Sequence, residues 1–177
     1  MIIGDFREEY KRYRALGTKA MAQVGDEALN HLPFPDGNSI AVIVRHVSGN
    51  LVSRFTDLLT ADGEKPNRNR DGEFADSAYT RAEVEAAWAL GFDIVDRELA
   101  KLSDTDAGRT VSIRGVELTV HEALCRSIAH AASHVGQIVL IARMLAAHSW
   151  QTLSIPRGQS KAFNSDPMNE RLARGKA

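Results

Sequence analysis

Apolar residues recur every three or four positions in four stretches of the chain, which is the spacing of α-helices with one buried face. These stretches run from about 4 to 30, 39 to 59, 80 to 102 and 119 to 147. Polar and charged residues fill the other positions of each stretch. The pattern therefore predicts an all-α fold, and four helices around one core make a four-helix bundle.

The expected helix boundaries carry recognisable signals. Asn38 or Ser39 can cap the second helix after the proline-containing turn at 33–35. The third and fourth helices each begin with a capping box, at Thr80–Glu83 and Thr119–Glu122. These caps fix the starts of three helices more firmly than their ends.

The segments between the helices differ in character. A long polar connection occupies 60–79, and a loop of that length in a compact domain tends to be functional or disordered. Alternating β-branched residues in 108–119 predict a short hairpin or an extended crossover. After the fourth helix we expect an extended tail that is ordered to about 163. We expect one domain over 1–165, followed by a charged tail at 166–177.

The amino-acid composition and charge of the chain disfavour several classes of function. The 177 residues are 44% hydrophobic and 25% charged, with a net charge of −1 and no basic run, so nucleic acid is a poor candidate partner. The start of the chain does not resemble a signal peptide, and no unbroken apolar run reaches the length of a membrane span. Cys125 is the only cysteine, which excludes an intrachain disulfide and favours a cytoplasmic location. We expect Cys125 to be a small buried apolar residue.

His130 and His134 stand four residues apart in the fourth predicted helix. That spacing places both imidazoles on one helix face, about 6 Å apart along the axis, which suits two ligands of one metal ion. His46 lies in the second predicted helix and could supply a third ligand. Taken singly, each histidine could instead be a hydrogen-bonded core or surface residue.

Polar residues surround these histidines on both predicted helices. Arg126 and Gln137 share the face of His130 and His134, while Asn50, Ser53 and Arg54 lie on or beside the face of His46. Polar groups on largely buried helices are costly unless they are paired or serve a site. Asn50, Arg54 and Arg126 are therefore our candidates for positioning a substrate.

The remaining candidates are weaker. His121 should face away from His130, His148 lies about 21 Å beyond His134, and His31 belongs to a turn. In the 60–79 connection, four charged residues could form a lid that supplies an arginine to an anion and a carboxylate as base or ligand, or they could simply be solvated. They are Arg68, Arg70, Asp71 and Glu73. The 154–160 segment could likewise fold over the end of the bundle.

The chain resembles the DinB-like superfamily, which includes bacillithiol and mycothiol S-transferases. Residues 129–138, Ala-His-Ala-Ala-Ser-His-Val-Gly-Gln-Ile, are similar to its H-x-x-x-H-x-G-Q-[IL] signature, and 39–50 to its second-helix segment. Residues 62–74 and 154–160 resemble one branch without an assigned activity. The resemblance implies a bundle in up-down-down-up order, a divalent metal on His46, His130 and His134, and homodimers.

The leading functional hypothesis is a metal-dependent enzyme, most plausibly a thiol S-transferase acting on a small electrophile. Zinc or nickel is the expected metal, although imidazole ligands alone do not choose between first-row ions. The partners would be a small-molecule substrate and a low-molecular-weight thiol, without nucleic acid or membrane. The alternatives are a metal-dependent hydrolase with the same ligands, a non-catalytic metal-binding or stress-related bundle, and an apo bundle in which the histidines only pack.

Overall fold

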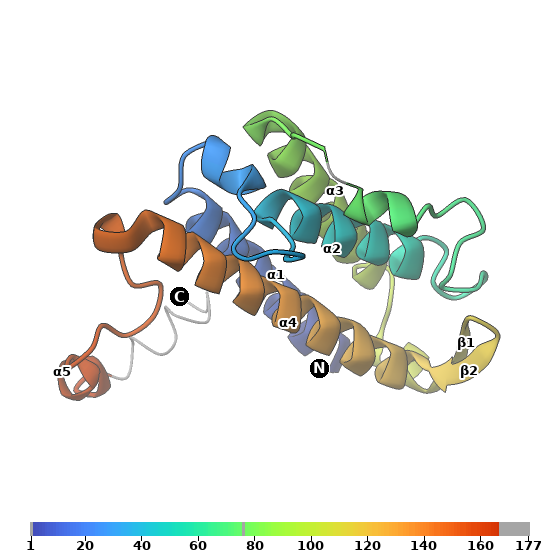
Figure 1. The fold of residues 1–177 in the computed structure, drawn as a ribbon. Coiled ribbons are helices and arrows are strands. Elements are labelled where there is room, and N and C mark those ends of the chain that lie inside the picture. The colour runs from blue at the N-terminus through green and yellow to red at the C-terminus, as the bar shows by residue number, and fades with distance from the viewer. Residues whose placement is uncertain (1, 76, 167–177) are drawn as a thin grey trace.

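Four long helices form most of the molecule. The computed structural model describes residues 2–75 and 77–166, and 63% of these are helical, consistent with an all-α fold. The long helices are α1 (Ile2–Met21), α2 (Ile40–Phe55), α3 (Arg81–Leu99) and α4 (Val120–Ala146). Helix α1 packs on α3 and α4, and α2 packs on the same two helices (Figure 1). The hydrophobic core lies between them.

The core contains the residues that the helical periodicity marks as apolar. Helix α2 is the most deeply buried of the four, with Ile40, Val44, Val47 and Leu51 completely enclosed. The two helices cross closely at Gly91 of α3, where an added Cβ would lie only 2.8 Å from the Cα of Ser48 on α2. A helix this enclosed can carry polar side chains only where they serve one another or a site.

Helix starts agree with the predicted caps, whereas several ends fall earlier than predicted. The side chains of Ser39, Thr80 and Thr119 each accept a hydrogen bond from the backbone three residues on. The first helix ends at Met21, and a separate 3-10 turn, η1 (Glu27–Asn30), follows it. Helices α2 and α3 end three to four residues before their predicted limits, because turns close their last carbonyls.

The 108–119 segment forms a hairpin, which decides between the two predicted alternatives. After the 3-10 turn η3 (Asp104–Gly108), β1 (Thr110–Ile113) pairs antiparallel with β2 (Val116–Thr119). Arg114 and Gly115 join them with φ of 56° and 73°. Two consecutive residues with positive φ are typical of a type I′ turn, in which glycine at the second position is free of steric strain.

The long connection between α2 and α3 is ordered over its described residues. It turns back against α2 and contains the 3-10 helix η2 (Asp71–Phe74). The Gly63 N–H donates to the carbonyl of Ser112, which joins the connection to the hairpin at 2.7 Å. This segment is therefore part of the folded body.

The chain beyond α4 is only partly extended. Helix α4 ends where Ala147 adopts a φ of 47°, followed by the turn η4 (Ala147–Ser149). A short helix, α5 (Ser160–Asn164), ends the described chain, so the prediction of a wholly extended tail is wrong there. The charged tail predicted at 166–177 lies outside the described residues beyond Asp166.

Helix α4 together with η4, Val120–Ser149, is long and apolar enough by length and composition to cross a membrane. The prediction that no segment reaches this length holds only for unbroken apolar runs. A core helix of a soluble protein passes the same test, so one such helix is weak evidence for a membrane. This helix packs on α1 and α2 and carries two of the three histidines of the candidate site.

Candidate metal centre and its cavity

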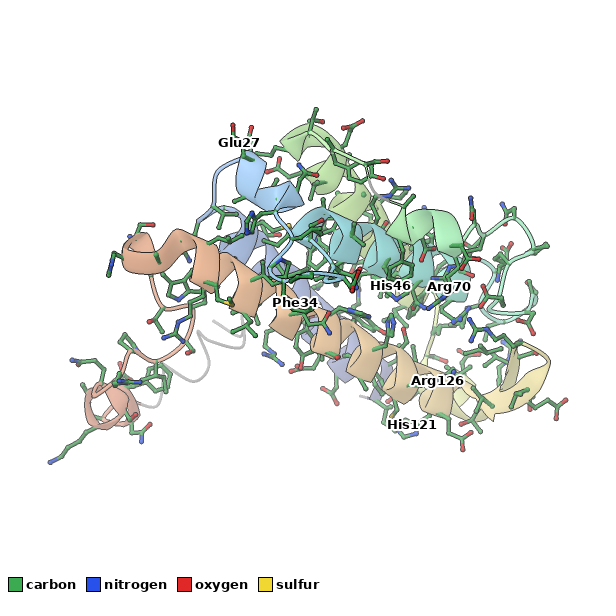
Figure 2. All side chains as sticks on the ribbon, in the orientation of Figure 1. Glu27, Phe34, His46, Arg70, His121 and Arg126 are labelled. Carbon is green, nitrogen blue, oxygen red and sulfur yellow. The ribbon has the colours of Figure 1, made fainter. Side chains whose placement is uncertain are left out.

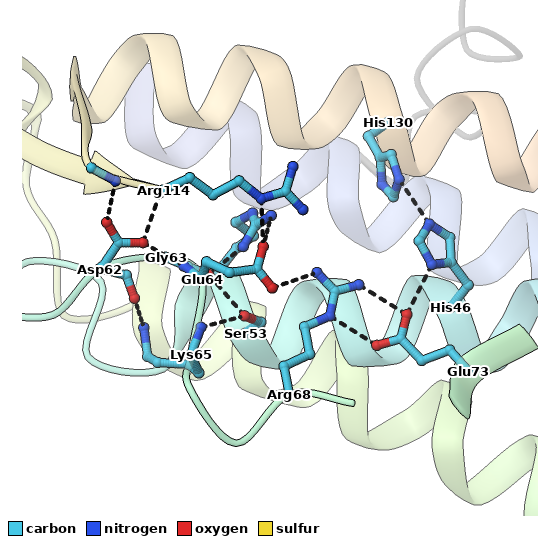
Figure 3. A network of polar contacts seen from close by, with 12 residues as sticks. His46, Ser53, Asp62, Gly63, Glu64, Lys65, Arg68, Glu73, Arg114 and His130 are labelled. Carbon is cyan, nitrogen blue, oxygen red and sulfur yellow. Dashed lines mark hydrogen bonds and ion pairs between the residues drawn. The ribbon is translucent and has the colours of Figure 1, made fainter. Parts of the chain in front are cut away.

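Three histidines from α2 and α4 converge at one point. One ring nitrogen each of His46, His130 and His134 lies within 4.8 Å of the other two. The Nε2 atoms of His46 and His130 are 3.1 Å apart (Figure 3). Two nitrogens on a tetrahedral ion with bonds of 2.0–2.1 Å would be separated by about 3.3 Å. These three side chains could hold a metal ion with small shifts of the third ring.

Glu73 fixes the orientation of His46. Its Oε2 lies 2.9 Å from His46 Nδ1, and both side chains are more than 90% buried. An ionised carboxylate can only accept, so Nδ1 carries the proton and the lone pair of Nε2 faces the other histidines. A carboxylate behind a ligating histidine is the usual second partner in metal sites.

The Glu73 carboxylate is held as an anion by a second partner. Arg68 donates to both of its oxygens, at 2.8 and 2.9 Å. Although burial disfavours the charged form, the hydrogen bonds from His46 and Arg68 lower the pKa of Glu73 below its usual range. A Cβ on Gly49 would lie 2.8 Å from Glu73 Cδ, so glycine at this position of α2 makes room for the carboxylate.

The two histidines of α4 lie in surroundings that favour neutral imidazole. Gln137 Oε1 lies 3.0 Å from His134 Nδ1 and can accept a hydrogen bond from its N–H, which leaves the lone pair of Nε2 free. Burial, followed by the nearby His134 and His46, lowers the pKa of His130 to about 4. Burial also lowers the pKa of His134. Neutral imidazole is the form that binds a metal ion.

A second cluster of charges borders the histidines. Glu64 receives hydrogen bonds of 2.9 Å from both Arg54 and Arg114, and Arg68 lies 3.6 Å away (Figure 3). Burial opposes its ionisation, but the hydrogen bond and charge of Arg54 outweigh this and lower the pKa of Glu64. Arg54 also donates to the Gly63 carbonyl, as does the Ser53 hydroxyl. The long connection is therefore bonded to α2 along the edge of the site.

A cavity of about 170 Å³ opens beside His46 and His130. The three candidate positioning residues, Asn50, Arg54 and Arg126, all line it. The other lining residues are Arg68, Arg70, Ile113, Arg114, Ala123 and Ser127. Figure 2 shows Arg70 and Arg126 approaching this region from the long connection and from α4. The structure thus brings the sequence candidates together with residues of the connection and the hairpin.

Some sequence expectations do not hold at this site. Glu73 was one of two carboxylates that could either act as a base or extra ligand or be solvated, and it does neither, since its carboxylate is bonded to Arg68 and the outer nitrogen of His46. Asp71 is solvated, with a side chain that is 99% exposed. Cys125 is exposed rather than buried, and its Sγ lies 3.7 Å from Nε2 of His121, one turn earlier on α4. Its small size did not place it in the core, although the neighbouring His121 packs on Phe6 of α1.

Other participants carried no separate sequence signal. The contact between Gly49 and Glu73 depends on how the connection folds back over α2, whereas Ser127 lies on α4 three residues before His130. For the 62–74 segment, only its mixture of positive and negative residues indicated that it contains ion pairs. His121 lies away from the triad, as helix geometry predicts.

Comparison with known proteins places the chain in a family. A family model described as "Protein of unknown function (DUF1572)" matches residues 2–159. Since the match covers most of the chain, the protein belongs to that family. No curated protein matches the sequence. The family match includes all three histidines and every residue that lines the cavity.

Proposed function

We propose that this protein is a metal-dependent enzyme that uses His46, His130 and His134 as its metal ligands. The observation that carries the proposal is the convergence of three ring nitrogens beside a cavity lined with polar and charged residues. Catalytic sites commonly combine three protein ligands with one position for solvent or substrate. Zinc or nickel fits a donor set of three imidazoles.

The arrangement favours a catalytic over a structural ion. Structural zinc sites are closed by four protein ligands. Among the described residues, no fourth histidine, cysteine or carboxylate joins the triad, and Glu73 is already bonded elsewhere. The cavity gives small molecules access to His46 and His130. A non-catalytic, metal-binding or stress-related bundle is the alternative that this access argues against.

The reaction proposed first is transfer of a low-molecular-weight thiol to a small electrophile. A bound divalent ion lowers the pKa of a thiol or of water, and so supplies a thiolate or hydroxide nucleophile at neutral pH. The residues Asn50, Arg54 and Arg126 would orient the substrate from the cavity wall. A hydrolase would use the same ligands with water, so the thiol dependence separates the two reactions.

The resemblance to the DinB-like superfamily supports this choice. The four long helices and the H-x-x-x-H-x-G-Q sequence of α4 are the features from which we propose a DinB-like bundle in up-down-down-up order. On the same grounds we propose a homodimer in the cytoplasm. A monomer by light scattering at micromolar concentration would contradict the dimer and leave the metal site unaffected.

The test begins with elemental analysis of protein purified without chelator or a metal-affinity tag. Wild type is compared with His46→Ala and with the double variant His130→Ala/His134→Ala, and His148→Ala serves as a control because this histidine lies outside the cluster. We expect about one metal per chain in wild type and control, and loss in the other two with circular dichroism unchanged. No metal after reconstitution with zinc and nickel would overturn the proposal.

Metal-loaded protein is then assayed with bacillithiol, mycothiol, glutathione and coenzyme A against a panel of small electrophiles. Consumption of electrophile that requires both thiol and metal supports a transferase. Metal-dependent hydrolysis without a thiol would replace the transferase by the hydrolase. Absence of both reactions would favour the non-catalytic bundle.

A further inference from the structure

The cavity beside the histidines carries more positive than negative charge. Five arginines line it, namely Arg54, Arg68, Arg70, Arg114 and Arg126. No carboxylate lines it, and the carboxylates paired with these arginines are Glu64, Glu73 and Asp71. Two positive charges therefore remain, although the whole chain has a net charge of −1.

Arg126 is the cation without a partner. Its neighbours in the cavity are paired, whereas Arg126 makes no ion pair or side-chain hydrogen bond with any residue that the structure describes. It projects from α4 one turn before His130, and both line the same cavity. A free guanidinium at the mouth of a polar cavity offers up to five donors to an anion.

Two buried polar side chains of the cavity also lack partners. Asn50 is only 9% exposed, yet its amide makes no hydrogen bond with a described residue. Ser127 is 7% exposed, and its hydroxyl faces the buried Tyr10 hydroxyl without a hydrogen bond of standard geometry to it or to another described residue. Buried polar groups are nearly always satisfied, by protein, water or ligand. Both residues line the cavity, so water or a ligand bound there can complete their hydrogen bonds.

We propose that this cavity binds a small substrate through an oxyanion group, a carboxylate or a phosphate, held by Arg126 and by the side chains of Asn50 and Ser127. At about 30 Å³ per molecule, about six water molecules would fill this volume, so the ligand must be small. The reacting part of such a molecule would then lie next to His46 and His130.

This inference deepens the proposed function by naming the substrate class, and it rests on that function only in taking the ligand for a substrate. Binding of the anion itself depends on Arg126, Asn50 and Ser127. An anion would also offset the repulsion between the arginines and a cation at the histidines. Metal and anion should therefore strengthen each other's binding, and such coupling is reciprocal.

The probes are inorganic phosphate and succinate, with the neutral succinamide as reference. Binding is measured at low ionic strength by calorimetry on metal-free protein, since phosphate precipitates zinc. The variants are Arg126→Gln, Asn50→Ala and, as a matched control on the same helix, Arg143→Gln, whose side chain is exposed outside the cavity. Circular dichroism and thermal unfolding establish that each variant is folded.

We expect at least one of the two anions to bind and succinamide to bind more weakly. Loss of a charge-assisted contact in Arg126→Gln should weaken binding about tenfold or more, and Asn50→Ala several-fold, with Arg143→Gln unchanged. Preference for phosphate or for succinate identifies the source of the oxyanion. Equal binding by Arg126→Gln and Arg143→Gln, or equal affinity for succinamide, would overturn the proposal.

The double variant His130→Ala/His134→Ala separates this inference from the metal proposal. Anion binding that persists in this variant supports a pocket built from the arginine and the polar side chains, even if no metal binds to wild type. Succinate, unlike phosphate, can also be titrated into metal-loaded protein. Succinate binding that occurs only in metal-loaded wild type, and is lost in the double variant, would show that the anion is a ligand of the ion and would overturn the pocket.

Discussion

At the scale of single residues, Glu73 is the part of the histidine cluster that the sequence predicted least. Its carboxylate binds the ring nitrogen of His46 that faces away from the other two histidines. Glu73→Gln keeps the shape of the side chain but removes the charge that pairs with Arg68 and orients His46. Loss of such a partner typically reduces metal affinity 10- to 100-fold. We expect a decrease of that size in a competition titration with a chromophoric chelator.

The control for this variant is Asp71→Asn, which removes a carboxylate from the same 3-10 helix where the side chain is 99% exposed. It should leave the metal affinity unchanged. Equal affinity of Glu73→Gln and wild type would mean that Glu73 only stabilises the connection.

Sequence-based prediction of single residues succeeded where helix geometry alone determines the position of a side chain. It failed where a segment distant in the sequence determines that position. Winding at 100° per residue placed His130 and His134 together and His121 apart. The same geometry says nothing about which side of His46 a glutamate 27 residues later will reach. Cys125 was misplaced because a position on the fourth helix turned away from His130 was taken to be buried, whereas it is exposed.

At the scale of elements, the site depends on how the connection between α2 and α3 lies on α2. Gly49→Ala would place a Cβ against the Glu73 carboxylate, which cannot swing away without leaving Arg68 and His46. We expect the variant to lower metal affinity about tenfold, as loss of the outer partner does. The same chelator competition measures it.

Gly136→Ala is the matched control, because it also replaces a glycine inside a long helix but has nothing within 4 Å of the added Cβ. It should retain metal affinity and raise the free energy of unfolding by up to about 1 kcal/mol through helix propensity. If both variants bind metal alike, the close approach of Glu73 to α2 is not needed for the site.

The hairpin is attached to the same connection through one carboxylate. Asp62 accepts hydrogen bonds from the Ser112 hydroxyl at 2.5 Å and from the backbone N–H groups of Arg114 and Gly115 at 2.8 and 2.9 Å. The bond from Ser112 and those from the backbone hold the pKa of Asp62 well below its usual range. The attachment should therefore persist in mild acid.

Asp62→Asn replaces an acceptor oxygen by an amide group that can only donate. We expect faster hydrogen exchange at Arg114 and Gly115, measured by mass spectrometry or NMR. Glu117→Gln, on the adjoining strand β2, is the control and should exchange like wild type. Unchanged exchange in Asp62→Asn would contradict the role of this carboxylate as the attachment point.

An element could be predicted from the sequence when the interactions that form it join residues close together in the chain. The long helices and their caps depend on neighbours within four residues, so the sequence pattern predicts them. The connection gains its order from the side chains of α2 and the hairpin, at separations of 10 to 53 residues. Its polar composition alone therefore left a lid, a solvated loop and disorder equally open.

At the scale of the whole molecule, we expect the histidine cluster to make stability depend on pH and on bound metal. The pKa of His130 is lowered to about 4 in the folded protein, while the unfolded chain has the ordinary value of about 6.5. Between these values the unfolded state binds more protons, so stability decreases as the pH falls from about 6.5 to 4. His134 contributes in the same direction.

Metal-free wild type should therefore unfold at a lower temperature at pH 5 than at pH 7. The double variant His130→Ala/His134→Ala lacks both titrating groups and should show a smaller dependence over the same range. Differential scanning calorimetry measures both. An equal dependence in the two proteins would assign the effect to other groups, such as the carboxylates.

A bound metal ion should stabilise the folded state, whereas protonation of the histidines favours the unfolded state. At a free zinc concentration 100 times the dissociation constant, linkage predicts about 2.7 kcal/mol of stabilisation, or a rise in the unfolding temperature of roughly 5–10 °C for a domain of this size. Because protons compete with the ion for the same nitrogens and the pKa of His130 is lowered to about 4, the rise should be larger at pH 7.5 than at pH 4. The double variant should show no rise at either pH, whereas His148→Ala should follow wild type. A zinc-dependent rise that persists in the double variant would locate the ion elsewhere on the molecule.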